Sequence, residues 1–218
     1  MLTFMGLRQF ESSGPKDESD DRIFLTFDDG PDPVWTPRVL DTLNRLGAKA
    51  TFFVIAPLAL RFPQLVRRMT QSGHAVELHC SNHLRHTELT RAEVEEDARR
   101  GLRTLRDLGL LPTLWRTPWG AVAPWTRALA NDLGLELVAW TIDTHDWRGD
   151  AASQMLARVR PDLQPGSIVL MHDALGPGAR REGCEETVTL LEKLVEHARF
   201  LGCKPRPMSV APARYSTA

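Results

Sequence analysis

The sequence of 218 residues is poor in cysteine, has a single tyrosine and carries almost no net charge. Its three cysteines, Cys80, Cys184 and Cys203, are odd in number and lack Cys-x-x-Cys spacing. They predict neither a disulfide framework nor a thiolate zinc site, and they mildly favour a reducing compartment. The formal net charge of -1 gives no electrostatic basis for binding nucleic acid or an anionic membrane, so we expect no nucleic-acid partner.

Long apolar runs are also absent. No run approaches the roughly 20 apolar residues of a membrane span, so we expect no span. Residues 1–10 contain an arginine but no charged start followed by a long apolar core, which is the pattern of a secretion signal. The chain as it stands therefore predicts a cytoplasmic location, and a removed signal would instead predict the cell envelope or secretion. The sequence carries no signal for an oligomeric state.

What is present suits one globular domain. A chain of 218 residues with 42% hydrophobic content can bury a sizeable core but is short for two full domains. Residues 11–21 are polar and rich in turn formers. We therefore expect a flexible lead-in over 1–21, a folded domain over 22–210 and a tail over 211–218.

Short apolar runs alternate with amphipathic segments through this domain. The expected strands are 22–27, 50–55, 74–78, 113–116, 136–142, 167–171 and 206–210, with six helices between them. Thr36 is expected to cap a helix that has Pro37 at its first position, and Thr90 with Glu93 fits a capping box. The alternation predicts an α/β fold with a parallel sheet, either open or closed into a barrel.

Reactive side chains gather where the expected strands end. They follow the first, third, fourth, fifth and sixth strands, and they are Asp28, Asp29, His79, His83, Arg116, Asp143, Asp146 and His172. The carboxyl ends of parallel strands form one rim, so residues that are distant in sequence become neighbours there. This rim is the predicted site.

The first of these segments places two adjacent carboxylates, Asp28 and Asp29, before a Gly-Pro turn. Adjacent side chains of an extended chain point to opposite sides, so both can serve one site only if the chain turns there. They could then act as a metal ligand and a base. An ordinary turn is the alternative interpretation.

The second segment has a His-x-x-x-His spacing, which on a helical turn would put His79 and His83 on one face. Two histidines with one carboxylate are the open-sided ligand set of catalytic zinc and of non-haem iron. Two polar loop histidines are the alternative.

Three later segments add further groups. Residues 116–120 offer a cation, Arg116, and an aromatic wall, Trp119, although a surface arginine before a loop would look the same. Residues 143–147 offer two carboxylates and an indole. His172 follows an apolar strand, where a lone histidine is usually structural but a carboxylate partner would hold it protonated as a general acid.

Together, the five segments resemble the motifs of the polysaccharide deacetylase family, the NodB-homology domain of carbohydrate esterase family four. They are residues 26–31, 79–83, 116–120, 143–147 and 170–172, in that order. The resemblance covers residues 22–210. It implies a distorted, incompletely closed (β/α)7 barrel, similar to a TIM barrel. It also implies metal-dependent removal of N-acetyl groups from glycans that contain N-acetylglucosamine, such as peptidoglycan or chitooligosaccharide.

The resemblance assigns the first two segments to metal and base. Asp29, His79 and His83 would hold one divalent ion, usually zinc, although cobalt or nickel serves in some members. Asp28 would be the general base, and Arg116 would pair with it to hold it ionised.

The resemblance assigns the remaining segments to acid and substrate. His172, oriented by Asp146, would protonate the leaving amine. Trp147 and Leu170 would flank the acetyl methyl group, and Trp119 would offer the sugar ring an apolar platform.

Three residues depart from the family pattern. Cys80 stands where the family usually has serine or threonine, Leu84 where proline often follows the second histidine, and Trp119 where tyrosine is usual. None of these changes removes a ligand or catalytic group. We do not expect His86 to be a ligand, since a catalytic metal needs open positions.

Other functions fit parts of the same pattern. An O-acetyl esterase acting on an acetylated polysaccharide such as xylan would share the fold and the site. A glycan-binding protein with a vestigial site is a further alternative, which the intact segments disfavour. A non-haem iron oxygenase would share the ligand set, but the β/α alternation disfavours it.

Overall fold

The computed structural model describes residues 21–209. The expected lead-in over 1–21 lies outside these residues except for Asp21, and the expected tail over 211–218 lies wholly outside them. The strands and helices run from Arg22 to Pro205, inside the expected domain of residues 22–210.

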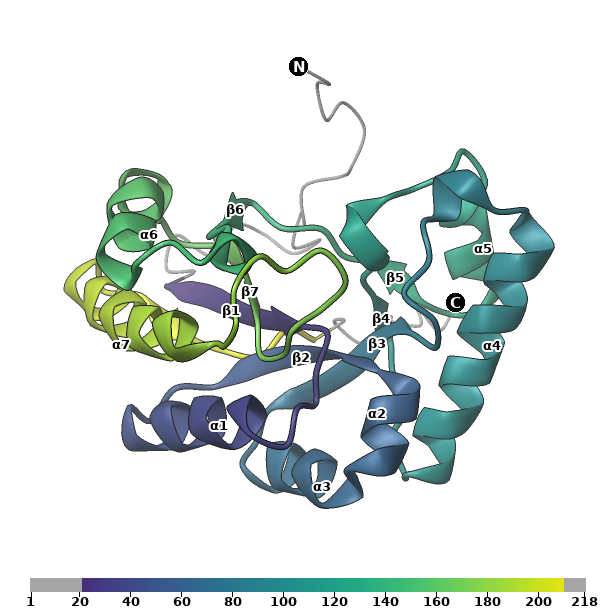
Figure 1. The fold of residues 1–218 in the computed structure, drawn as a ribbon, viewed down its shortest axis with the longest axis horizontal. Coiled ribbons are helices and arrows are strands. Elements are labelled where there is room, and N and C mark those ends of the chain that lie inside the picture. Colours follow the sequence, from purple (N-terminus) through teal and green to yellow (C-terminus); the bar gives the residue numbers. More distant parts are fainter. Residues whose placement is uncertain (1–20, 210–218) are drawn as a thin grey trace, which may run out of the picture.

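One parallel sheet organises the described chain (Figure 1). Its eight strands are β1 (Arg22–Asp28), β2 (Ala50–Ile55), β3 (Ala75–Cys80), β4 (Leu114–Trp115), β5 (Glu136–Leu137), β6 (Ile142–Asp143), β7 (Ile168–His172) and β8 (Lys204–Pro205). Seven run in the order β5-β4-β3-β2-β1-β7-β6, and β8 pairs with β1. The end strands β5 and β6 follow each other in the sequence, but they pair with β4 and β7 respectively. The sheet is curled and not closed, which confirms the predicted incomplete (β/α)7 barrel.

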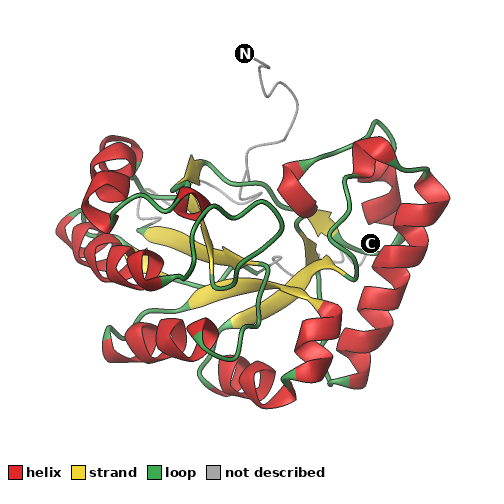
Figure 2. Cartoon of the chain, viewed as in Figure 1, coloured by secondary structure: helices red, strands yellow, loops and turns green. Residues whose placement is uncertain are grey.

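Helices lie around the outside of this sheet (Figure 2). They are α1 (Trp35–Arg45), α2 (Ala56–Arg61), α3 (Pro63–Gln71), α4 (Arg91–Asp107), α5 (Thr126–Asp132), α6 (Ala152–Val159) and α7 (Glu185–Phe200). Each long helix turns apolar side chains inward, as Leu190, Leu191 and Leu194 of α7 show by being fully buried. None of the helices within residues 21–209 has the length and apolar character required to cross a bilayer.

Strand β1 lies at the centre of the core. Its apolar residues Ile23, Leu25 and Phe27 are fully buried, and burying such side chains is the main favourable term in folding. The strand pairs with β2 on one side and β7 on the other, so that Asp28 lies level with His172. The central pairing therefore sets the first and last of the predicted site segments side by side.

The strand expected over 136–142 is wrong, because the structure divides it into β5 and β6. Glu136 and Leu137 pair with β4, whereas Ile142 and Asp143 pair with β7. Between them the chain crosses the opening of the barrel, and the carbonyl of Ala139 accepts a hydrogen bond from Arg116 Nη2 at 3.1 Å. The chain changes pairing partner here, so it cannot form one continuous strand.

The strand expected over 206–210 is wrong as well. The pairing with β1 occurs earlier, at Lys204 and Pro205, and residues 206–209 are not strand. Prolines at 205 and 207 have no N–H to donate, which prevents a regular ladder.

The two helix starts had different outcomes. The capping box of Thr90 and Glu93 is confirmed at the start of α4. Thr36 is not a cap, because α1 begins at Trp35 and the Asp32 side chain accepts the N–H groups of Val34 and Trp35. Thr36 instead lies inside the helix and donates to Asp173, which directly follows the last site segment.

Candidate active site

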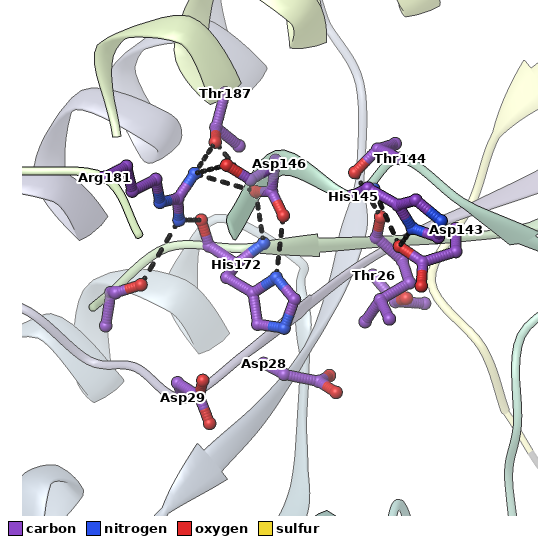
Figure 3. A network of polar contacts seen from close by, with 12 residues as sticks. Thr26, Asp28, Asp29, Asp143, Thr144, His145, Asp146, His172, Arg181 and Thr187 are labelled. Atoms are coloured by element: carbon purple, nitrogen blue, oxygen red, sulfur yellow. Dashed lines mark hydrogen bonds and ion pairs between the residues drawn. The ribbon is translucent and has the colours of Figure 1, made fainter. Parts of the chain in front are cut away.

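The turn that the two carboxylates require lies at Asp29 itself. Asp28 ends β1, and Asp29 has a φ of 74°, in the left-handed region that non-glycine residues rarely adopt. Both side chains line the same pocket, and both lie below His172 in Figure 3. Both are buried, with exposed fractions of 4% and 6%.

Asp29, His79 and His83 form a candidate metal centre. One ligand atom from each lies within 4.8 Å of the others. Asp29 Oδ1 is 3.4 Å from His79 Nε2 and 3.2 Å from His83 Nε2, and it is buried without a hydrogen-bond partner among residues 21–209. Burial alone would raise the pKa of Asp29, but the two histidines hold it well below its usual value. An unpartnered buried carboxylate oxygen between two imidazoles fits a cation.

The surroundings of His79 support the same interpretation. Its Nδ1 lies 2.7 Å from the carbonyl oxygen of Arg116, and a carbonyl can only accept. Nδ1 therefore carries a proton, which leaves Nε2, beside Asp29, as the nitrogen that can bind a cation. This is the usual way in which a protein fixes the tautomer of a metal-binding histidine.

The expectation that the two histidines share a helical turn is wrong. His79 lies on β3, and His83 lies in the loop that follows. The loop is held by Asp97 of α4, whose carboxylate accepts the backbone N–H groups of Ser81 and Asn82 at 2.9 Å each. The imidazoles converge because this loop folds back and is fixed there.

Asp97 was not predicted from the sequence as part of the site. It lies on the buried face of α4 with Val94, Ala98 and Gly101, and only 9% of it is exposed. A carboxylate within an apolar stripe needs a hydrogen-bond partner, so this placement was a usable signal.

Arg116 is fixed against Asp28. Its Nη1 donates to Asp28 Oδ1 at 2.8 Å and to Thr26 Oγ1 at 2.7 Å. The guanidinium is fully buried and lies over the ring of Phe53, 4.2 Å from its centroid. The alternative of a surface arginine is therefore wrong, and Asp28 has a permanent cation beside it.

His172 and Asp146 form a second pair, in which Asp146 is buried and His172 is partly buried. His172 Nδ1 lies 2.7 Å from Asp146 Oδ1, and the backbone N–H of His172 donates to Asp146 Oδ2 at 2.9 Å. Burial opposes the charged imidazole, but the Asp146 carboxylate raises the pKa of His172 to about 9. Burial likewise opposes the charge of Asp146, and His172 and Arg181 lower the pKa of Asp146 to about 2.

Two residues that support this pair were missed in the sequence. Arg181 Nη1 donates to Asp146 Oδ2 at 3.1 Å, and Arg181 Nη2 donates to the His172 carbonyl at 3.1 Å. Thr187 Oγ1 donates to Asp146 Oδ2 at 2.7 Å (Figure 3). Arg181 comes from the loop after β7 and Thr187 from the first turn of α7, so no residue spacing near Asp146 pointed to them.

These groups surround one pocket of about 430 Å³, a size typical of small-ligand sites. Nine predicted site residues line it: Asp28, Asp29, His79, His83, Trp119, Asp143, Trp147, Leu170 and His172. Arg116 and Asp146 lie behind the wall, where they hold Asp28 and His172. His86 is not among the lining residues, and it is buried against Trp115.

Two features of the pocket wall were not expected. The backbone of Trp119 is left-handed, with a φ of 54°, and its ring stands edge-on to His83 with centroids 4.0 Å apart. The loop after β7 passes over Asp29 so closely that a Cβ on Gly176 would lie 1.8 Å from Asp29 Oδ2. Residues 174 and 176–181 of this loop supply one wall.

The sequence also matches a known family. Residues 15–138 match the model of polysaccharide deacetylases. The chain belongs to the polysaccharide deacetylase family. The five segments that suggested this family are the ones that converge on the pocket.

Two deacetylases that are similar to this chain differ in length. The chitooligosaccharide deacetylase of Bradyrhizobium sp. (strain ANU 289) is 34% identical over 193 residues, which cover 85% of this chain and 88% of that protein. The peptidoglycan-N-acetylglucosamine deacetylase PgdA of Listeria monocytogenes is 39% identical over 163 residues, which cover 73% of this chain. The matched region spans about a third, 34%, of the Listeria protein.

A solved polysaccharide deacetylase structure agrees with the fold. The Bc1960 peptidoglycan N-acetylglucosamine deacetylase superposes with a TM-score of 0.78 at 29% identity, covering 84% of both chains. The incomplete barrel is thus shared with a family member over most of its length.

The arrangement combines three chemical capacities at one pocket. An open-sided ligand cluster can hold a cation, a carboxylate with a fixed cation can accept a proton, and a protonated imidazole can donate one. Groups of this kind, facing one cavity, suit the hydrolysis of an acyl bond.

Proposed function

We propose that this protein is a metal-dependent hydrolase that removes acetyl groups from N-acetylglucosamine units of a glycan. The observation that carries the proposal is that the three residues of the candidate metal centre line the same pocket as Asp28 and His172. The names of the relatives, which are peptidoglycan and chitooligosaccharide deacetylases, support the substrate class.

Asp29, His79 and His83 would hold one divalent ion, with zinc preferred and cobalt or nickel as alternatives. A ligand set of two histidines and one carboxylate leaves coordination positions open for water and substrate. When bound, such an ion lowers the pKa of a water toward ~7 and polarises the acetyl carbonyl.

Asp28 is the proposed general base. Arg116 holds one of its oxygens at 2.8 Å, which fixes the carboxylate and leaves its other oxygen to accept a proton from water. Arg116 is itself held by Thr26 and by the carbonyl of Ala139, so the base has little freedom to turn away from the pocket.

His172 is the proposed general acid. With a pKa of about 9 it is protonated at neutral pH. Asp146 binds Nδ1, which leaves the Nε2 proton on the pocket side, where Figure 3 shows the ring facing Asp28 and Asp29. That proton can pass to the nitrogen of the leaving amine as the carbon–nitrogen bond breaks.

The remaining predicted residues would shape the substrate site. Trp147 and Leu170 would flank the acetyl methyl group, and Trp119, whose exposed fraction is 39%, would pack against the sugar ring. The position of the three side chains on the pocket wall supports these roles, which the family resemblance implies.

The test is acetate release from N-acetylated oligosaccharides. Chelation is expected to abolish release, and Zn²⁺ or Co²⁺ to restore it. Asp28→Asn is expected to stop turnover while the protein still binds metal, and Asp41→Asn, on an exposed face of α1, serves as the matched control. Normal turnover in Asp28→Asn would reject Asp28 as the base.

The same assay separates the competing functions. Release of acetate from O-acetylated xylan alone would make the protein an ester hydrolase. Glycan binding without release from any substrate would make it a binding protein with an inactive site.

A further inference from the structure

Two guanidinium groups at the pocket each lie over the ring of an indole. Arg180 lies over the ring of Trp147, 5.6 Å from its centroid, and Arg85 lies over Trp119 at 4.3 Å. All four residues line the pocket that also contains His172. Neither arginine belongs to the base, the acid or the metal centre.

The position of Arg180 is fixed by its own backbone. Its N–H donates to the carbonyl of Trp147 at 2.8 Å, which ties the loop after β7 to the segment that carries the indole. Stacking on a ring occupies the face of a guanidinium and leaves the N–H edge free, and that edge matches the two oxygens of a carboxylate.

The charge of Arg180 is not used within the described chain. Residues 21–209 place no carboxylate within ion-pair distance of it. Among the described residues, the carboxylate that pairs with Arg85 is that of Glu88, 3.8 Å away, and a pair between two exposed side chains contributes little. By contrast, the buried Arg116 and Arg181 are engaged with Asp28 and Asp146.

The carboxylates that line the pocket have other contact partners than these two arginines. Asp28 is paired with Arg116, and Asp29 faces the two histidines of the metal centre. Asp143 lies 2.7 Å from His145 Nδ1. The carboxylates of the pocket therefore leave the two guanidinium groups open to a ligand.

We infer that Arg180 and Arg85 form a carboxylate-binding subsite, and that it selects glycans with an acidic group near the reacting sugar over neutral ones. The inference rests on the proposed deacetylase function and specifies its substrate class. In peptidoglycan a carboxylate is available from the lactyl ether of the neighbouring sugar or from the attached peptide. A chitooligosaccharide carries none.

The test compares three tetrasaccharides at equal length. The first is neutral, fully N-acetylated chitotetraose. The second alternates N-acetylglucosamine with N-acetylmuramic acid and has free lactyl carboxylates. The third is the same alternating tetrasaccharide with its peptides attached. Binding is measured by calorimetry on the zinc-loaded Asp28→Asn protein, and acetate release is measured on the zinc-loaded wild type.

The two acidic tetrasaccharides are expected to bind more tightly than chitotetraose, and added salt is expected to reduce this difference in affinity. Arg180→Gln is expected to lower the ratio of acidic to neutral affinity about tenfold, the effect of one charge-assisted hydrogen bond. Arg85→Gln acts in the same direction. Arg148→Gln is the matched control, since Arg148 lies over the same Trp147 ring but does not line the pocket.

Preference for the peptide-free acidic tetrasaccharide identifies the lactyl carboxylate as the bound group. Preference for the third tetrasaccharide alone identifies a carboxylate of the peptide. Equal affinity for the acidic and neutral tetrasaccharides, or an equal loss of affinity for both in Arg180→Gln, overturns the subsite. If the enzyme releases acetate from none of the tetrasaccharides but still binds the acidic ones more tightly through Arg180, the proposed deacetylase function is rejected and the subsite is retained.

Discussion

The two halves of the site differ in how far their buried carboxylate oxygens find hydrogen-bond partners within the chain. The metal half consists of Asp29, His79 and His83, and the acid half of Asp146, His172, Arg181 and Thr187. In the metal half, Asp29 Oδ1 is buried without a hydrogen-bond partner among the described residues. In the acid half, both oxygens of Asp146 accept hydrogen bonds.

This difference separates what the fold supplies from what it leaves to a ligand. The acid half is preorganised, because its charges are already paired and hydrogen-bonded in a buried environment. The metal half holds a carboxylate oxygen whose desolvation is offset only when a cation enters. Substitutions in the metal half should therefore change metal affinity, and those in the acid half should change the pH profile.

The largest effect is expected in the metal half from Asp29→Asn. An amide cannot supply the negative charge that offsets the ion, so metal binding should weaken by at least about 100-fold and acetate release should fall below detection. Calorimetric zinc titration and the acetate assay measure the two effects. Asp32→Asn, in the same turn but outside the ligand set, is the control; retention of full zinc affinity in Asp29→Asn would contradict the metal centre.

In the acid half, Asp146→Asn is expected to lower kcat by about 10²- to 10³-fold without loss of metal, the typical contribution of a positioned acid. His172 acts as its protonated form, so wild-type activity should fall as pH rises through about 9. Without the Asp146 charge, burial lowers the pKa of His172, and the fall should move toward neutral pH.

The pH profile of kcat checks this prediction. Asp150→Asn is the matched control, because Asp150 pairs with Arg158 at a partly exposed position. A high-pH limb that does not move in Asp146→Asn would mean that Asp146 does not set the charge of His172.

Much of the site could be predicted because its residues follow strands. Asp28, Asp29, Arg116 and His172 each stand at the end of a short apolar run, and parallel pairing brings such ends to one rim. The alternation of strands and helices predicted the parallel α/β sheet, and the family resemblance specified the incomplete barrel. Local pattern is sufficient where the backbone direction alone decides the position of a side chain.

The rest depends on contacts between elements that are distant in sequence. Asp97 reaches the metal loop from α4, and Arg181 and Thr187 reach Asp146 from beyond β7. The expected helical turn for His79 and His83 was wrong because a strand end and a loop can converge as well as a helix can. The stacked Arg85 and Arg180 lie on loops, whose paths have no periodicity to predict them.

A smaller effect is expected from Asp97→Asn, which leaves every metal ligand in place. The amide keeps one acceptor but turns an NH₂ group toward the backbone N–H groups of Ser81 or Asn82, which loosens the loop between the histidines. Metal affinity should fall about 10- to 100-fold, as for other residues that support metal ligands, and excess zinc should restore kcat.

Zinc titration of activity and calorimetry measure this effect. Glu96→Gln is the control, because Glu96 is the exposed neighbour of Asp97 on α4 and pairs only with Arg103. If excess zinc leaves kcat of Asp97→Asn low, Asp97 acts on more than metal affinity, and the assignment of the loop to the metal half is wrong.

The smallest effect is expected from Trp119→Ala, which belongs to neither half. The ring stands edge-on to His83 and is partly exposed, so its loss removes apolar area for the sugar without removing a charge. KM should rise several-fold, in line with the loss of one aromatic contact, with kcat and the pH profile nearly unchanged. Leu111→Ala, which removes an exposed apolar side chain away from the pocket, is the control. A fall in kcat together with weaker zinc binding would instead place Trp119 in the metal half, as a wall that holds His83.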